Sequence, residues 1–561
     1  WPDTIQAWDQ MQTEAEAAGQ KADPFLVRQF DKNVRAGTLL GFFRSANSYA
    51  ALIALCALTT AGLSLQRLRD RDDPGFALVL GLPALASLGL IYLTGSRTAI
   101  AGLLLWAIAI AIGWFNRKGF RQRAGALFVI GAACVVAIAG TVVAIGISTG
   151  GLLHNSLTFR WNYWAGSWSL FKAHPITGVG WSNFGNSYLA HRLPMAAEEI
   201  KDPHNFVVKF LAETGIVGAV LVLAWFARTA WEATRPIEPR ETSSAVPAGG
   251  SSLRLIAGIA ISFAILRTIV LQPLSLLFPE PVKIVLYAIL LSFGLLAASV
   301  RAARATGADD RAAPLLLLAA IVAIGGFWLH AMVDFALFET GPLLVMMVLL
   351  GAVLGVRHPG AAGRVSRTKI AIAALCAVSL GLMTFIALVV VPLASAERHA
   401  GAAMEMATRK LYSSAADELR QAYITSPVSN QDYASRASWM MAMSGTSKPD
   451  DVVGMLTLAI NADPAFGQLW LDRGRYLARM ENSADAAIAD FQRYLSRNPA
   501  DIGARLELAD FLTASNKPRE AAAEYRRALD FNSKLDDAEP RRLSPDRVRE
   551  IDAKIARLPA G

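Results

Sequence analysis

The chain has 561 residues, of which 54% are hydrophobic and 18% are charged, and its formal net charge is +9. Soluble globular proteins carry about 25% charged residues, so this composition excludes an ordinary soluble enzyme and a disordered chain. Three widely spaced cysteines inside apolar runs, Cys56, Cys134 and Cys376, exclude a disulfide scaffold and a cysteine-based zinc site. In a membrane protein the excess positive charge marks cytoplasmic loops, so we expect no nucleic-acid partner.

Ten apolar stretches are long enough to cross a bilayer, which takes roughly 20 residues. They are 47–66, 75–93, 98–115, 124–147, 205–227, 255–277, 282–300, 312–329, 337–356 and 370–394. The sequence starts at Trp1 without a Met or a signal-like segment. We therefore expect a fragment or processed form that lacks upstream helices, with 1–46 as an outward-facing N-terminal segment.

The loops between these stretches alternate strictly in charge. One set is rich in Arg and Lys, and the other, which includes 272–281 and 330–340, has almost none. The positive-inside rule places the basic set in the cytoplasm. The remaining segments then face outward: 1–46, 94–97, 148–204, 272–281, 330–340 and the tail from 395.

The tail changes character at about 397, where it becomes charged, Ala-rich and helical in periodicity. Asp463-Pro464 and Asn498-Pro499 lie about one repeat apart, each at the end of a predicted helix. A weaker copy spans 401–427. A period near 34 residues with small residues at fixed places predicts tetratricopeptide-like helix pairs over 397–561. The alternative is a generic Ala-rich helical bundle. Repeat stacks usually bind proteins, so we interpret the tail as a docking module.

Two arginines stand on the outward side at headgroup depth. Arg97 lies in the turn Thr94–Thr98 between two apolar stretches, and Arg160 opens the aromatic run Arg-Trp-Asn-Tyr-Trp. Both fit a structural role, Arg97 by snorkelling at a helix end and Arg160 on an interfacial helix. Both also fit recognition of an anionic headgroup, because the guanidinium fork matches two phosphate oxygens.

A turn-rich segment and a histidine follow. The Gly-x-Gly of His174-Pro-Ile-Thr-Gly-Val-Gly is weak evidence for a phosphate loop, since no lysine follows it. Asp202-Pro203-His204-Asn205 precedes an apolar helix that carries Glu213. A neutral His204 could accept a proton from an attacking hydroxyl. Alternatively, Asp202 or Asn205 caps the helix and His204 is only interfacial.

His330 and Asp334 lie at the outward end of a later apolar stretch. Residues four apart share one face of a helix, so the two could form an auxiliary acid–base or orienting pair. The other interpretation, a polar contact between helices, is the one that we favour.

The combination is more informative than any member. Paired arginines suit a diphosphate, and histidine suits activation of a hydroxyl, whereas no cluster of carboxylates, Cys or His suggests a metal. This pattern favours transfer from a lipid diphosphate, in which the arginines neutralise the departing diphosphate and His204 activates the acceptor.

The motifs resemble those of the O-antigen ligase/polymerase superfamily. The resemblance covers about 40–394, and it rests on Gly41–Ala50, Gly95-Ser-Arg97, Arg160, His174–Phe184, Pro203-His-Asn205, Glu213–Gly218 and His330–Phe335. Its longer members often carry tetratricopeptide tails.

The resemblance implies a mostly helical, multi-pass protein of the bacterial inner membrane that uses undecaprenyl-diphosphate-linked glycans at the periplasmic face. It further implies a metal-independent, inverting glycosyltransferase without a cofactor. Arg97 and Arg160 would bind the pyrophosphate and His204 would be catalytic, with His330 and Asp334 as possible auxiliaries.

The implied partners are a lipid-linked glycan donor, a glycan or lipid A-core acceptor, membrane lipids, and envelope assembly proteins at the periplasmic tail. The sequence does not distinguish an O-antigen ligase from a polymerase or from an enzyme that glycosylates proteins. The predicted repeat tail favours a polymerase or a role in exopolysaccharide assembly.

The predicted fold is therefore all-α: a helical membrane domain over 47–394, with outward loop 148–204, followed by an α-solenoid. Two other functions remain open. A transporter or flippase for lipid-linked sugars should show mid-membrane charges and repeated halves, and Arg267 is the only clear charge that we identify deep in a span. A non-catalytic anchor for a tetratricopeptide scaffold would need only one or two helices.

Overall fold

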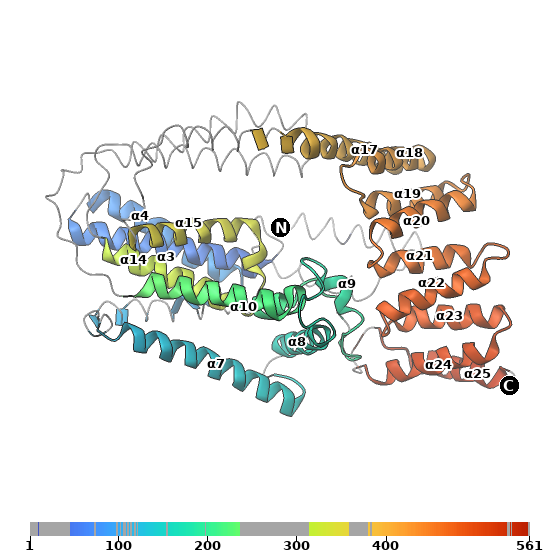
Figure 1. Cartoon of the computed structure of the whole chain (residues 1–561), viewed down its shortest axis with the longest axis horizontal. Helices are drawn as coiled ribbons and strands as arrows, with labels where there is room; N and C mark the ends of the chain where they lie inside the picture. Colours follow the sequence, from blue (N-terminus) through green and yellow to red (C-terminus); the bar gives the residue numbers. More distant parts are fainter. Residues whose placement is uncertain are drawn as a thin grey trace. The chain divides into compact units, whose positions relative to one another are not determined.

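The structure is a computed structural model, and it describes Asp9 and, with short gaps, residues 45–235, 313–357 and 380–558. Every regular element in these residues is a helix, which confirms the all-α class (Figure 1). The chain divides into two compact units. One comprises Trp1–Pro239, Ala313–Ala362 and Tyr525–Ala560, and the other comprises Arg240–Ala312, Gly363–Glu524 and Gly561.

Most of the predicted spans that the structure describes coincide with helices. These helices are α3 (Ala46–Asp70), α4 (Pro74–Leu93), α7 (Ala124–Thr149), α10 (Phe206–Thr234), α14 (Pro314–His330) and α15 (Thr340–Arg357). By length and composition, 3 described helices can cross a membrane, namely Ala46–Asp70, Gly125–Thr149 and Phe206–Thr234. Ala77–Leu93, Pro314–His330 and Thr340–Val356 are shorter and apolar.

The other predicted spans are described only in part or not at all. The stretch 98–115 is described in fragments, and 255–277 and 282–300 lie outside the described residues. Of 370–394, the structure describes only positions from Leu380 onwards, where a π-helix, η3 (Ile386–Val390), leads directly into α17 (Val391–Thr408).

Small residues bring α3 and α14 close together. A Cβ added at Gly62 would lie 2.3 Å from the Cβ of Ala319, and such close approach is typical of packed membrane helices. The side chain of Gln66 accepts a hydrogen bond from the N–H of Leu315 at 2.8 Å, which satisfies one of the free donors at the start of α14. Their shared core continues onto α15 through Met346.

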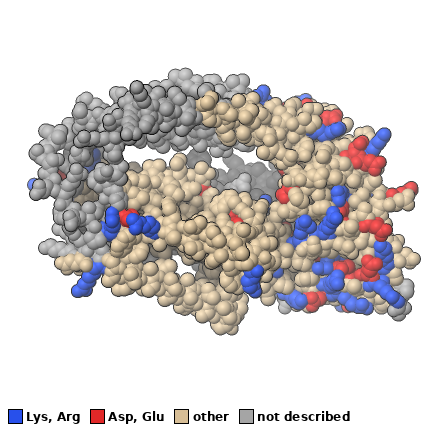
Figure 2. Space-filling view, viewed as in Figure 1, with Lys and Arg blue, Asp and Glu red and all other residues tan. Residues whose placement is uncertain are grey.

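The outer surface of this helical part is apolar. On α7, Val136 is 71% exposed and Ile147 is 74% exposed. Soluble monomers rarely expose large continuous apolar patches, so lipid is the fitting solvent for this helix. Figure 2 shows few charged side chains over these helices and many over the C-terminal helices.

The loop 148–204, predicted to face outward, is folded where the structure describes it. It contains the aromatic helix α8 (Asn155–Ala173) and the short helix α9 (Phe184–Tyr188). Tyr163 and Leu170 of α8 form a small buried cluster with α9 and with Ala212 of α10. This cluster attaches the loop to the N-terminal part of α10.

The tail is a succession of helix pairs (Figure 1). After α17 come α18 (Tyr412–Thr425), α19 (Gln431–Ser444), α20 (Pro449–Ala462), α21 (Gly467–Leu477), α22 (Ala484–Arg497), α23 (Ile502–Ala514), α24 (Pro518–Ser533) and α25 (Pro545–Arg557). The predicted helix ends before Asp463-Pro464 and Asn498-Pro499 are confirmed.

A buried ion pair joins α21 to α22. The guanidinium of Arg473 binds the Asp490 carboxylate in a forked arrangement, with Nε–Oδ2 at 2.7 Å and Nη2–Oδ1 at 3.0 Å. The Asp490 side chain is only 3% exposed. Removing one partner of such a pair leaves a buried charge without compensation.

We therefore expect Arg473→Met to destabilise the pair α21–α22 by roughly 3 kcal/mol. Hydrogen exchange of these helices in the purified full chain, followed by mass spectrometry, measures the loss. Arg409→Met is the matched control, because Arg409 forms an exposed pair with Glu405, and such pairs contribute at most about 1 kcal/mol. Equal protection in both variants would contradict the prediction.

Candidate functional site

Arg160 is held against the turn that follows α14. Its Nε donates a hydrogen bond to the carbonyl oxygen of Val333 at 3.0 Å. Burial lowers the pKa of Arg160, and the carboxylates of Asp334 and Glu198 act in the opposite direction. An arginine stays protonated under any such shift, so the site contains a fixed positive charge.

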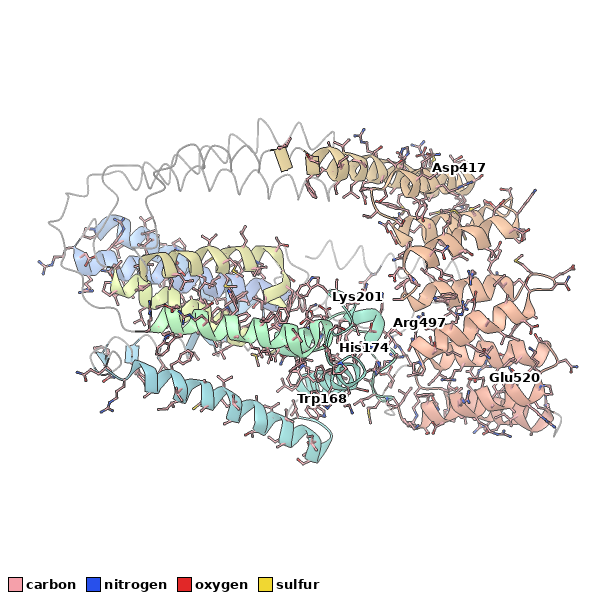
Figure 3. The ribbon with its side chains drawn as sticks, in the orientation of Figure 1. Trp168, His174, Lys201, Asp417, Arg497 and Glu520 are labelled. Atoms are coloured by element: carbon pink, nitrogen blue, oxygen red, sulfur yellow. The ribbon has the colours of Figure 1, made fainter. Side chains whose placement is uncertain are left out.

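The segment after α8 docks onto a break in α10. Figure 3 labels His174, which follows the end of α8. Gly215 has φ 64° and ψ −169° inside α10, a conformation essentially restricted to glycine. The break frees three backbone groups of α10, and residues 175–180, here called the docking turn, bind all three. Val179 N–H binds Ala212 O at 3.0 Å, Gly180 N–H binds Glu213 O at 2.9 Å, and Ile216 N–H binds Pro175 O at 2.8 Å.

This arrangement explains the Gly-x-Gly motif. A Cβ on Gly178 would lie 2.3 Å from the carbonyl carbon of Glu213, and one on Gly215 would lie 2.2 Å from the oxygen of Ile176. The glycines therefore permit backbone-to-backbone contact. Because the N–H groups of Val179 and Gly180 bind helix carbonyls, this segment is not arranged as a phosphate loop.

His204 immediately precedes the cap of α10. Asn205 is the N-cap, and its side chain accepts from the N–H groups of Val207 and Val208 at 2.9 and 3.2 Å. This capping role was one of the alternatives in the sequence. His204 itself has φ 54°, in the left-handed region that few non-glycine residues adopt. Its N–H donates to Oδ1 of Asp202 at 2.8 Å.

The imidazole of His204 is enclosed by aromatic rings. Its ring centroid lies 5.1 Å from that of Phe335 and 6.2 Å from that of Tyr163. The Nδ1 atom is buried and has no hydrogen-bond partner among the described residues. Burial lowers the pKa of His204, and Arg160 and Lys209 lower it further. The carboxylates of Asp334 and Asp202 partly offset this shift. The net result is a neutral imidazole at pH 7.

His330 and Asp334 do not share a helix face as predicted, because α14 ends at His330 and Asp334 lies in the following turn. Asp334 is 1% exposed and accepts a hydrogen bond from the hydroxyl of Ser48 on α3 at 3.3 Å. The buried Nε2 of His330 has no partner within the described part of the chain. The charge of Asp334 nevertheless acts on both His330 and His204.

The predicted site residues therefore meet in part. Arg160, His204 and Asp334 are brought together by Phe206 N–H, which donates to Ala331 O at 3.2 Å, and by the bond from Arg160 to Val333. Arg97 lies outside the described residues. Within the described ranges, no group of three His, Cys, Asp or Glu side chains could hold a metal ion.

Sequence reasoning missed three contributors. Trp164 donates its indole N–H to Pro203 O at 3.0 Å and fixes the residue before His204. Ser48 binds Asp334. Lys209 forms a 2.7 Å ion pair with Asp202, although it stands in the second turn of a predicted span. A charge in such a place is itself a signal of function.

We expect Gly215→Ala to detach the docking turn. The left-handed conformation alone costs an alanine roughly 1–3 kcal/mol, and the added methyl group meets the oxygen of Ile176. Limited proteolysis of residues 174–183 in the purified protein should become faster. Gly325→Ala in α14 is the control, since its Cβ would meet nothing within 4 Å. Native resistance of the Gly215→Ala loop would contradict this account.

Part of the chain that forms this site matches a known protein family. Residues 82–223 match the family model of the O-antigen ligase, and the matched stretch contains Arg97, Arg160 and His204 but not His330 or Asp334. No curated protein matches the chain. The family match and the apolar helices support a membrane protein that ligates or polymerises glycans, with a lipid-linked glycan and an acceptor as substrates. Residues 82–223 of the chain are therefore similar to the O-antigen ligase family.

Proposed function

We propose that the protein is a glycosyltransferase of the bacterial inner membrane that transfers or polymerises an undecaprenyl-diphosphate-linked glycan at the periplasmic face. One observation carries this proposal. A neutral, buried histidine, a fixed guanidinium and a buried carboxylate converge from three separate elements, as His204, Arg160 and Asp334. The periplasmic assignment rests on the alternation of basic loops in the sequence.

In the proposed reaction, His204 accepts the proton of the acceptor hydroxyl while the hydroxyl oxygen attacks the anomeric carbon. The bond from that carbon to the diphosphate oxygen breaks, and undecaprenyl diphosphate leaves with the electron pair. Arg160, together with Arg97, neutralises the charge that develops on the diphosphate. A single displacement inverts the anomeric centre, and in this proposal the named side chains carry it out without a metal ion.

Asp334 has a separate role in this proposal. Once His204 has taken the proton it is an imidazolium, and the nearby carboxylate stabilises that charge. This is the electrostatic role that a buried aspartate plays beside a general-base histidine. The hydroxyl of Ser48 holds the carboxylate in place. His330, on which the charge of Asp334 also acts, is the auxiliary member of the group.

We expect His204→Ala to lower glycan transfer by roughly 100- to 10,000-fold, which is the usual contribution of a general base, without lowering the abundance of the protein. Purified protein in vesicles with an undecaprenyl-diphosphate-linked repeat unit and a lipid A-core acceptor, followed by mass spectrometry, measures transfer. His174→Ala is the control, because His174 is exposed on the same loop.

The same assay carries a pH test. The general base must be neutral, and its lowered pKa keeps it neutral above about pH 6.5, the ordinary value for histidine. Transfer should therefore be flat with rising pH above that point and should fall only below it. Transfer that is insensitive to His204→Ala would overturn the enzymatic proposal, and lipid-linked glycan crossing the membrane in the variant would favour a transporter.

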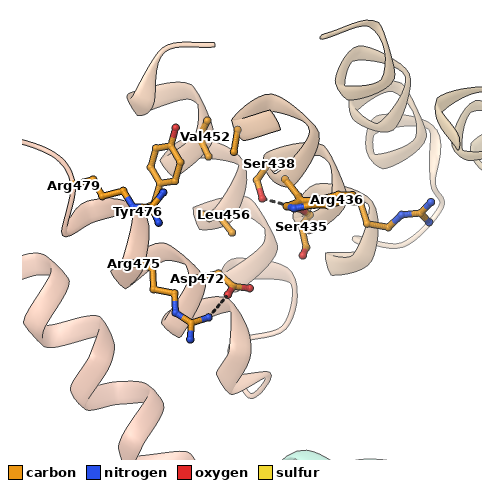
Figure 4. A pocket seen from close by; sticks show the side chains of 11 residues that line it. Ser435, Arg436, Ser438, Val452, Leu456, Asp472, Arg475, Tyr476 and Arg479 are labelled. Atoms are coloured by element: carbon orange, nitrogen blue, oxygen red, sulfur yellow. Dashed lines mark hydrogen bonds and ion pairs between the residues drawn. The ribbon is translucent and has the colours of Figure 1, made fainter. Parts of the chain in front are cut away.

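For the tail we propose tetratricopeptide-like repeats that dock an acidic segment of an envelope protein. A groove of about 390 Å³ lies between α19, α20 and α21 (Figure 4). Trp439 on its wall is 58% exposed. Arg479 adds a positive charge to the lining, whereas Arg436 is paired with Asp432, and Arg475 is paired with Glu507 and Asp472. An exposed aromatic beside arginines is typical of a binding hot spot.

Combined replacement Trp439→Ala and Arg479→Glu should weaken docking by roughly tenfold or more, since hot-spot residues contribute at least about 2 kcal/mol. Glycan output in cells should fall, whereas transfer by the purified protein should not change. Arg409→Glu changes charge outside the groove lining and is the control. Unchanged output in cells would refute the docking role of the groove.

A further inference from the structure

Lys209 is a buried cation between two carboxylates. It is 9% exposed, and its Nζ lies 2.7 Å from Oδ2 of Asp202 and 3.8 Å from Oε1 of Glu213. The ring of Phe338 lies 4.6 Å from the ammonium. A buried ammonium is costly unless carboxylates compensate it, and the reaction described above assigns this one no role.

Asp202 connects that cation to His204. One carboxylate oxygen binds Lys209, and the other accepts the backbone N–H of His204 at 2.8 Å. The neighbours of His204 in the chain are fixed by other bonds, Pro203 by Trp164 and Asn205 by its capping role. The Asp202 carboxylate is the side chain that binds the backbone of His204 itself.

That backbone needs support. A non-glycine residue at φ 54° stands in a sparsely populated region that costs about 1 kcal/mol or more, so a free chain would leave it. A change of φ swings the imidazole relative to Asn205 and the helix start. Displacement of a reacting group by about 1 Å can cost about 100-fold in rate.

We propose that Lys209 is a positioning residue which, through Asp202, holds His204 in its left-handed conformation and so aims the imidazole at the acceptor hydroxyl. The inference rests on the proposed function, because it takes His204 to be the general base. Lys209 acts through Asp202 and does not touch the donor.

Glu213 anchors the other end of this chain of groups. It is 1% exposed, and its Oε1 accepts the backbone N–H of Phe184 at 3.4 Å, with Ser182 as a further backbone donor. Lys209 therefore lies between two carboxylates: Glu213, which binds the backbone of Phe184, and Asp202, which binds the backbone of His204. The break in α10 and the geometry of His204 are linked through one ammonium.

The decisive experiment compares steady-state kinetics of the full chain in vesicles for Lys209→Met and for Lys201→Met. Lys201 is exposed in the same loop (labelled in Figure 3) and should be neutral. For Lys209→Met we expect kcat to fall by roughly 10- to 100-fold, as is usual for supporting groups, with the KM for the lipid diphosphate donor nearly unchanged. A raised donor KM with unchanged kcat would make Lys209 a phosphate ligand and overturn the proposal.

Asp202 variants keep the test valid if Lys209→Met does not fold. Asp202→Asn keeps an oxygen that can accept the His204 N–H but loses the ion pair, whereas Asp202→Ala loses both. We expect Asp202→Ala to lose roughly tenfold more kcat than Asp202→Asn. Equal kcat in the two variants would overturn the proposal, because the bond to the backbone would then not matter.

The pH profile separates positioning from loss of stability. The charged and titratable groups that face His204 are Asp202 in its own loop, Asp334 after α14, Arg160 and Tyr163 on α8, and Lys209 on α10. Lys209 lowers the pKa of His204, so removing its charge raises that pKa and moves the acid limb of kcat to higher pH. A lower kcat with an unmoved limb would indicate a merely structural role and refute the proposal.

The variant His204→Ala distinguishes failure of the proposed role of His204 from failure of the positioning role of Lys209. If it retains full transfer, the assignment of His204 fails whatever Lys209 does. If it is inactive and Lys209→Met behaves as the native protein, only the positioning role fails.

Discussion

The break in α10 at Gly215 is the constraint on which the docking of the segment after α8, and with it the candidate site, depends. Backbone groups at membrane depth must find partners, since lipid offers none. The break frees the carbonyls of Ala212 and Glu213 and the N–H of Ile216, and residues 175–180 bind all three. A loop would otherwise have many conformations above a bilayer. Here it is attached to a membrane helix by backbone hydrogen bonds that depend on two glycines and on no particular side chain.

That attachment decides where the charges can stand. With the loop fixed, α8 presents Arg160 to the turn after α14, where it binds the Val333 carbonyl. The same end of α10 carries Lys209 and Glu213, buried and compensated by each other and by Asp202. Because these opposite charges compensate one another locally, they can stay buried at this end of α10.

The sequence predicted the helices well because their signals are local: apolar length for the spans, and Asp-Pro or Asn-Pro for helix ends in the tail. It also grouped Arg97, Arg160 and His204 from their predicted common side of the membrane, with His330 and Asp334 as possible auxiliaries. It did not predict the shared face of His330 and Asp334, because the helix ends at His330. Nor could spacing reveal the docking turn, since the carbonyls that it binds are free only because of a glycine 35 residues after Gly180. Lys209 was missed because the sequence does not show that the chain turns at His204 and brings Asp202, seven residues earlier, onto its ammonium.

The electrostatics of the site have a consequence for the order of events in the proposed reaction. Arg160 lowers the pKa of His204, and so does Lys209. A diphosphate bound at Arg160 would offset its positive charge, and the influence of Arg160 on His204 would weaken. The pKa of His204 would then rise, and the imidazole would become a stronger base while the donor is present. Asp334, which raises the same pKa, would gain relative weight. The general base would therefore be weakest in the empty site and strongest when a leaving group is in place, which limits proton uptake by His204 to the productive complex.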